Sequence, residues 1–203
     1  LPAPTPQTEE QVSGAAPTDL SPWAGLTPLP WQSLGGDYLG GDAFTDLSPL
    51  AGLTDLTYLR IYGNDQITNL GPLAGLINLD SLWLNYNQIT DLGPLDGLIN
   101  LTELVLERNQ ISNLSPLAGL TNLTELRLSE NQITELSPLA GLTNLEFLHL
   151  DNNLITEIGP LAGLTNLRGG RGWEYWYMLG LDIRHNHIDI TPGSPARQVI
   201  DSL

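Results

Sequence analysis

Few residues of this chain could take part in acid–base or covalent chemistry. There are three histidines, His149, His185 and His187, and no cysteine, which excludes a thiolate nucleophile and a cysteine-based zinc site. His149 and Asp182 are candidates for a pair on adjacent strands, although an insertion between them leaves their register open. A histidine–carboxylate pair without a nucleophile or a pocket does not make a mechanism. We therefore expect no catalytic residue and no enzyme.

Cofactor and metal sites have equally little support. The chain has no lysine, which excludes a GxxxxGK phosphate-binding loop. The glycines around Arg171 lack the strand–GxGxxG–helix context that a dinucleotide requires. His185 and His187 flank an asparagine, and a turn explains their spacing without a metal. We expect neither a cofactor nor a bound metal.

Charge excludes two further classes of partner. The formal charge is −16 at neutral pH, from 23 acidic residues and 7 arginines. Nucleic acids and anionic lipid surfaces are bound by clustered basic residues, so neither is expected here. No apolar run approaches the roughly 20 residues of a transmembrane helix. Because the chain begins with Leu1 and not with Met, we expect a fragment or a processed product, such as one that has lost a signal peptide.

The candidate residues lie within an internal repeat of 22 residues. The regular units are 70–91, 92–113, 114–135 and 136–157. Residues 47–69 form the same unit with one extra residue, best placed at Asp65, and residues 158–190 form it with about eleven inserted after Leu167. A decayed unit over 20–46 opens the array. Seven such units predict a solenoid in which stacked coils, one per unit, share a continuous core.

Each unit contains an LxLxxNxI segment, as in Leu126, Leu128, Asn131 and Ile133. The alternation predicts a short strand whose leucines point into the core while the residues between them point out. The asparagine falls at a turn, where its amide is expected to bond the backbone of neighbouring coils. The predicted asparagine ladder consists of Asn64, Asn87, Asn109, Asn131, Asn153 and Asn186, with Asp42 in the decayed unit.

The other half of the unit, Ser-Pro-Leu-Ala-Gly-Leu, predicts one helical turn on the opposite side of the coil. Serine is expected to cap the turn, proline to occupy the first helical position and glycine to end it. A turn this short is not stable alone and must be held by packing.

The consensus LxxLxxLxxLxxLxLxxNxI resembles the leucine-rich repeat superfamily, in the 22-residue class typified by bacterial internalins, over about residues 20–190. The resemblance implies an α/β fold: a right-handed solenoid with a parallel β-sheet on the concave face and short 3-10 or α turns on the convex face. It also implies a secreted or surface-displayed bacterial recognition module. The helical amino-terminal cap and the immunoglobulin-like domain of internalins are not recognised here, so their receptor binding is not carried over.

Composition divides the chain into three predicted parts. Residues 1–19 form a Pro/Thr-rich extended leader, 20–190 the repeats, and 191–203 a short C-terminal cap helix with Ser194 as N-cap. An aromatic insertion at 168–180 interrupts the repeats. Its candidate subunit-contact residues are Trp173, Tyr175, Trp176 and Tyr177. These rings either cover the last coil or form a protrusion that contacts a partner or a second subunit.

Side chains that point out of the concave face are not needed for the core, so their types are informative. The candidate partner-binding residues are Tyr58, Arg60, Tyr62, Trp83, Tyr86, Arg127 and His149. The first five cluster on two adjacent coils and predict a surface that recognises protein or glycan; alternatively, aromatic residues simply suit strand surfaces. Further along, Glu103 and Glu125 are expected side by side as an unfavourable like-charge pair. With Glu107 and Glu130 they form either a solvated face or a site for a basic partner or a calcium ion.

Two functional hypotheses follow. The first is a non-catalytic extracellular bacterial protein that recognises or adheres to a protein or a glycan. The alternative is a structural subunit of a self-assembling extracellular filament or surface layer, in which the leader and the aromatic insertion make the contacts between copies of the chain.

Overall fold

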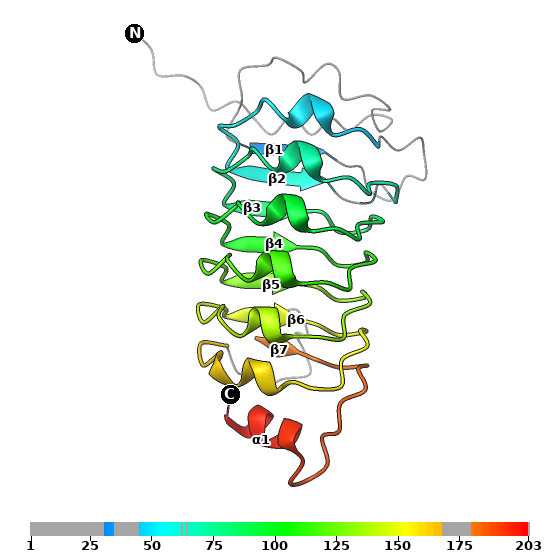
Figure 1. Ribbon diagram of the computed structural model, residues 1–203, viewed down its shortest axis with the longest axis vertical. Helices are drawn as coiled ribbons and strands as arrows, with labels where there is room; N and C mark the ends of the chain where they lie inside the picture. The colour runs from blue at the N-terminus through cyan, green and yellow to red at the C-terminus, as the bar shows by residue number, and fades with distance from the viewer. Residues whose placement is uncertain (1–30, 35–44, 62, 64, 168–179, 203) are drawn as a thin grey trace.

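The structure, a computed structural model, describes residues 31–34, 45–61, 63, 65–167 and 180–202. Short strands alternate with 3-10 turns along the chain until one α-helix closes the array (Figure 1). The strands are β1 (Trp31–Leu34), β2 (Tyr58–Ile61), β3 (Ser81–Trp83), β4 (Glu103–Val105), β5 (Glu125–Arg127), β6 (Phe147–His149) and β7 (Leu181–Asp182). The 3-10 turns are η2 (Ser48–Leu50), η3 (Gly71–Leu73), η4 (Gly93–Leu95), η5 (Ser115–Leu117), η6 (Ser137–Leu139) and η7 (Gly159–Gly163).

The strands form one parallel sheet in the order β1-β2-β3-β4-β5-β6-β7, so every strand pairs with its neighbours in sequence. Leu82 pairs with Leu104 and Leu104 with Leu126, one repeat apart each time. Leu148 pairs with Leu181 across the insertion, which therefore leaves the register intact. The predicted right-handed leucine-rich repeat solenoid, with its sheet on the concave face and its 3-10 turns on the convex face, is confirmed.

The core is a stack of leucine and isoleucine columns that runs between the sheet and the 3-10 turns. In the coil of β5, Leu126 and Leu128 come from the strand side, Ile133 from the turn after it, and Leu117 from η5; all are fully buried. The same positions are buried in the coils on either side, so each coil completes the core of its neighbours.

The 3-10 turns begin differently from the sequence-based expectation. The serine, or the glycine that replaces it, is the first residue of the turn and the proline is the second; the serine makes no capping bond. Instead, the first N–H of the turn donates to the acidic or amide side chain two residues earlier. Gly93 N donates to Asp91 Oδ1 at 2.8 Å, and Ser115 N donates to Asn113 Oδ1 at 3.0 Å. The repeated Asp, Asn or Glu before each of η2 to η6 is therefore its cap.

The ladder asparagines bond the backbone as predicted, from Asn87 to Asn186; Asn64 and Asp42 lie outside the described residues. Asn131 is typical: its Nδ2 donates to Leu128 O at 3.0 Å within its own coil and to Leu106 O at 3.0 Å in the preceding one. Its Oδ1 accepts from Ile111 N at 3.0 Å. One side chain thus closes the turn of its own coil and ties that turn to the previous coil.

A second asparagine column, which sequence analysis missed, runs along the convex side of the solenoid. Each member donates from Nδ2 to a backbone carbonyl of the preceding coil at 2.9 Å. The pairs are Asn78 to Thr54, Asn100 to Ile77, Asn122 to Ile99, Asn144 to Thr121 and Asn166 to Thr143. These exposed hydrogen bonds link each convex loop to the loop of the preceding coil, once per repeat, as the buried ladder does.

From Asn87 to Asn186, the residue before each ladder asparagine has a positive φ, a left-handed conformation that L-residues adopt with strain. The column consists of Tyr86 (φ 59°), Arg108 (54°), Glu130 (56°), Asn152 (56°) and His185 (55°). The chain must turn sharply where each strand ends, and the asparagine bonds hold it there. None of these residues is glycine, so the column keeps side chains at the edge of the concave face.

Helix α1 (Pro195–Ser202) closes the array beside η7. Ser194 Oγ accepts a hydrogen bond from Arg197 N at 3.2 Å and caps the helix. Ala196 is buried, and Val199 and Ile200 pack against the core. Within the described part of the chain, no helix is both long and apolar enough to cross a membrane.

Replacing Asn131 by alanine should lower the free energy of unfolding by about 2–4 kcal/mol, because buried backbone groups of two coils lose their partners. Asn186→Ala is the matched comparison and should cost less, since Asn186 is only partly buried in the last coil. Urea denaturation followed by circular dichroism measures both; equal costs would contradict the role assigned to the ladder.

The glycines that follow the 3-10 turns are not required by the backbone. Gly119 has no positive φ, and a Cβ added there would meet nothing within 4 Å. Gly119→Ala should therefore raise the free energy of unfolding by about 0.4–1 kcal/mol, because alanine lowers the conformational entropy of the unfolded chain. Gly193, with φ 88°, is the control, and Gly193→Ala should destabilise the protein. Thermal melts of the two variants should shift in opposite directions.

Candidate recognition face

The outward residues of the strands line up in rows across the sheet, and we call this surface the concave face. One row pairs Arg60 with Trp83 and then runs through Val105 to Arg127. The row continues from Arg127 to His149 and from His149 to Asp182. The predicted neighbourhood of Tyr58, Arg60 and Trp83 and the open register of His149 and Asp182 are both settled by this pairing.

The aromatic and arginine side chains of β2 to β4 stack on one another. Arg60 Cζ lies 4.2 Å from the ring centroid of Trp83, and Arg108 Cζ lies 4.8 Å from that of Tyr86. Each is a cation–π contact that holds a long side chain against a ring. Tyr58, one row along, is half-buried beside Ser81.

Several candidates cannot be located. Tyr62 lies outside the described residues, and so do the insertion aromatics Trp173, Tyr175, Trp176 and Tyr177. Their predicted roles in partner and subunit contacts stay predictions.

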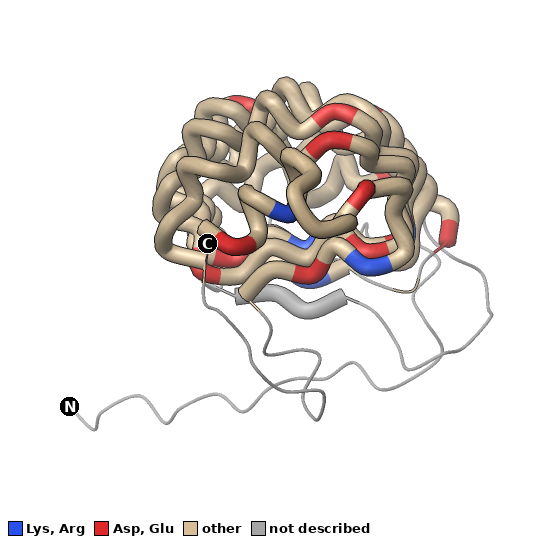
Figure 2. Tube along the Cα trace, turned by 90° about the horizontal axis from the view of Figure 1, so that it is seen from below, with Lys and Arg blue, Asp and Glu red and all other residues tan. Residues whose placement is uncertain are grey.

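The acidic residues over β4 and β5 are largely compensated within the chain. Glu103 and Glu125 pair side by side, as expected. Glu103 Oε2, however, accepts from Ser81 Oγ at 2.6 Å, and Glu125 forms an ion pair with Arg127 two residues along the same strand. These contacts relieve the like-charge repulsion that the sequence predicts for the pair. Figure 2 shows arginine and acidic segments together on the sheet side, whereas the opposite side carries acidic segments.

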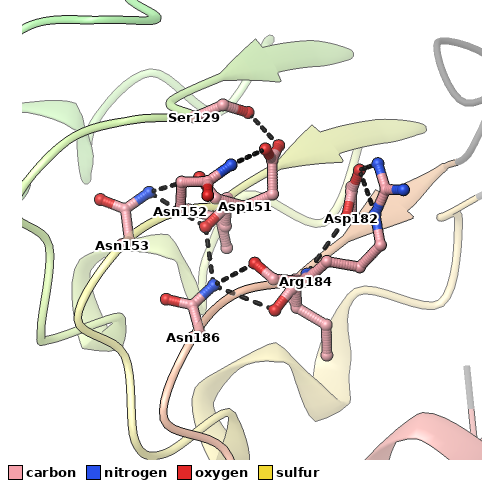
Figure 3. Close-up of polar contacts among 9 residues, drawn as sticks. Ser129, Asp151, Asn152, Asn153, Asp182, Arg184 and Asn186 are labelled. Atoms are coloured by element: carbon pink, nitrogen blue, oxygen red, sulfur yellow. Dashed lines mark hydrogen bonds and ion pairs between the residues drawn. The ribbon is translucent and has the colours of Figure 1, made fainter.

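A second polar cluster lies at the ends of β6 and β7 (Figure 3). Arg184 holds the carboxylate of Asp182 with two nitrogens, Nε at 2.9 Å from Oδ1 and Nη2 at 2.6 Å from Oδ2. One coil earlier, Asp151 accepts from Ser129 Oγ and from Asn152 Nδ2. Both Asp182 oxygens are thus engaged by Arg184, so the carboxylate serves an ion pair.

Two concave-face carboxyls are shifted in opposite directions. Burial raises the pKa of Glu107 above its ordinary 4.5, although the charges of Arg127 and His149 oppose the shift. Burial would also raise the pKa of Asp182, but hydrogen bonds from the side chain and backbone of Arg184, with the charges of Arg184 and His149, hold it below its ordinary 3.8.

Metal binding finds no ligand set among the described residues. No group of three or more His, Cys, Asp or Glu side chains there is arranged to hold an ion. The expectation that the Glu103–Glu125 region attracts calcium therefore has no geometric support in this part of the chain.

Two unsatisfied atoms on β3 and just beyond it were not anticipated from the sequence. Trp83 Nε1 and Asn85 Oδ1 are buried without a hydrogen-bond partner. Asn85 is not a ladder residue, and the repeat pattern gives it no role. Whether its side-chain oxygen finds a hydrogen-bond donor depends on residues of the neighbouring coils, which the sequence of one repeat does not show.

The two shifted carboxyls predict opposite pH dependences. A carboxyl whose pKa is lower in the folded than in the unfolded chain stabilises the fold at pH values above its unfolded-state pKa, and this stabilisation is lost as the pH falls. Asp182→Asn should therefore lower Tm at neutral pH and have little effect at strongly acid pH. A carboxyl whose pKa is higher in the folded chain favours the fold only when it is protonated, below about pH 4.5, and it destabilises the fold once it ionises. Glu107→Gln removes that ionisation and should therefore raise Tm at neutral pH. Calorimetric melts across this range test both signs; a neutral-pH loss of stability in Glu107→Gln would contradict the desolvation argument.

The sequence and fold match known leucine-rich repeat proteins. A family model described as Leucine Rich repeats (2 copies) matches residues 77–119 and again residues 121–163. A comparison with curated proteins finds no match.

Among solved structures, internalin C2 of Listeria monocytogenes is 42% identical with a TM-score of 0.64, over 75% of this chain and 63% of that chain. Internalin InlF of the same species is 39% identical with a TM-score of 0.73, over 86% of this chain and 47% of that one. A leucine-rich repeat protein of Leptospira interrogans, 24% identical with a TM-score of 0.61 over 86% of this chain and 47% of that one, agrees in fold.

This chain spans less than two thirds of the length of the two internalins. From the matched repeat family and these similarities, the chain is an internalin-like leucine-rich repeat protein.

Proposed function

We propose that this chain is a non-catalytic recognition module that binds a protein partner across its concave face. The main support is that the inward and outward side chains of the strands have different roles. The inward leucines and the ladder asparagines account for the fold, whereas the partly exposed Arg60, Trp83 and Arg127 of the outward row lie outside the hydrophobic core. His149, the next residue of the row, is only 3% exposed. Solenoids present such rows as extended binding surfaces.

The stacked arginines favour a protein over a glycan as the partner. Sugars are held by aromatic rings with an open face, but Arg60 covers one face of Trp83 and Arg108 covers one face of Tyr86. Arginine and aromatic side chains that are already ordered bind protein surfaces at a low entropy cost. A glycan remains the competing ligand in the experiment.

We further propose that the protein acts outside the cell, secreted from or displayed on a bacterium, in adhesion or recognition. The support is its similarity to two Listeria internalins and to a Leptospira leucine-rich repeat protein. Fractionation of the source cells with an antibody against the chain, followed by protease treatment of intact cells, tests this. Recovery only inside protease-resistant cells would contradict it.

The test of recognition is a binding screen against extracellular proteins and glycans with three forms of the chain. The wild type and the convex control Thr121→Ser should bind the same protein, and Trp83→Ala should lose about tenfold or more in affinity, as expected for a central aromatic contact. Binding to glycans alone would replace the protein proposal. Binding that all three forms share equally would remove the concave face as the site.

A second candidate function is a subunit of a filament or surface layer. Its support is the open sheet, in which β1 and β7 each pair on one side only within the described residues, and unpaired edges of this kind are a route to assembly. The charge of −16 opposes it through mutual repulsion of copies. Light scattering and negative-stain electron microscopy at physiological salt decide: a monomer of 22.0 kDa excludes this candidate, and regular filaments establish it.

A further inference from the structure

Asn85 and Glu107 lie next to each other on the concave face, at the ends of β3 and β4. The strands pair Trp83 with Val105, and the same register continues beyond them, with Leu84 N donating to Val105 O and Tyr86 N to Glu107 O. Asn85 therefore stands opposite Glu107, about 4.8 Å away along the sheet. Both side chains belong to the outward set, because Leu84 between Trp83 and Asn85 points into the core.

This adjacent pair offers hydrogen-bond acceptors that nothing in the described chain satisfies. Asn85 is 8% exposed, and its Oδ1 accepts no hydrogen bond. Glu107 is partly buried, and no described residue donates a hydrogen bond to its carboxylate, in contrast to Glu103, Glu125 and Asp151. A buried acceptor without a donor costs free energy, and a carboxylate that loses water costs more.

The arginines of the concave face make their direct contacts with other residues, although the charges of Arg127 and His149 also act on Glu107. Arg127 is paired with Glu125, Arg108 with Glu130, and Arg184 with Asp182. Arg60 stacks on Trp83. Over β4 to β7 the described concave face thus carries more carboxylates than arginines, and the site at Glu107 has the polarity that attracts a cation and repels an anion.

A third unsatisfied atom lies two residues along the same strand. Trp83 Nε1 is a buried donor without an acceptor. A peptide segment lying along β3 has both complementary groups, a backbone carbonyl for the indole N–H and a side-chain donor for the Asn85 and Glu107 oxygens. Because Trp83 Nε1 and Asn85 Oδ1 are buried, the atoms that cover them must move aside for these bonds to form. This pairing of one donor with two acceptors distinguishes the site from a simple acidic patch.

We propose that Asn85 and Glu107 receive an arginine or lysine side chain from a basic segment of a partner protein, whose backbone carbonyl meets Trp83 Nε1. The proposal rests on the recognition function above and specifies the chemistry of its partner. Charge-assisted bonds to a carboxylate in a partly dry site are among the stronger polar contacts. The overall charge of −16 would speed the encounter with a basic segment.

The experiment is a titration of the isotope-labelled chain with acetyl-Gly-Arg-Gly-amide, followed by the NMR signals of the Trp83 indole and the Asn85 side-chain amide. Acetyl-Gly-citrulline-Gly-amide is the matched probe, because citrulline keeps the shape and lacks the charge. We expect saturable shifts of both signals with the arginine peptide and at least about tenfold weaker binding of the citrulline peptide.

The matched variants are Glu107→Gln and the control Glu157→Gln, an exposed glutamate that precedes η7 on the convex side. Glu107→Gln should weaken the arginine peptide about tenfold or more, and Glu157→Gln should leave its affinity unchanged. Unchanged backbone signals elsewhere in Glu107→Gln show that the variant folds. Equal binding by both variants, shifts confined to convex acidic residues, or no saturable shift of the two signals would overturn the proposal.

The proposal and the recognition function fail in different ways. If the peptide does not bind but a protein partner still depends on Trp83, the face recognises its partner by other contacts and only the basic segment is wrong. If the partner screen also fails, both are wrong.

Discussion

The solenoid depends on the hydrogen bonds that each ladder asparagine makes to two successive coils. Leucine packing is non-directional and would tolerate sliding of one coil over the next. The amide of Asn131 does not, since its donors and acceptor meet fixed backbone groups in its own coil and in the preceding one. These buried bonds therefore fix the register, and the register brings the outward side chains into rows. The arrangement of side chains on the concave face therefore depends on the hydrogen bonds of the ladder asparagines.

Stability and recognition are separated within every strand. The inward residues repeat almost without change, whereas the outward ones vary from Arg60 through Val105 to His149. Where outward residues bear charge, most are compensated locally, as in the Arg184–Asp182 pair. Glu107 and Asn85 are the exceptions, because each keeps an acceptor that the fold does not satisfy. Groups that cost stability and serve no internal contact are the ones that a partner has reason to use.

The repeat made most of the fold predictable, because a period of 22 residues carries the same register from coil to coil. The rows through Arg60, Trp83 and Arg127 followed from counting alone. The predictions failed where the answer depends on groups that the period does not identify. The cap of η2 to η6 is the Asp, Asn or Glu two residues before each turn and not the serine, and the convex column of Asn78 and its equivalents bonds a different coil. The sequence offered His149 and Asp182 as a cross-strand pair but left their register open, and the strand pairing confirms it. The unsatisfied oxygen of Asn85 was not predictable, because it depends on the cross-strand neighbours.

The near-identity of the central units has a genetic consequence. Because each coil contacts only its neighbours through the same ladder, a tandem duplication or deletion of one whole unit keeps both the reading frame and every hydrogen bond at the junction. A gain or loss of another length interrupts the spacing of the ladder unless the coil accommodates it between bonded positions, as happens after Leu167, where the flanking strands still pair. The length of the concave face is therefore free to change in whole coils, while the chemistry presented by each coil changes by ordinary point substitution.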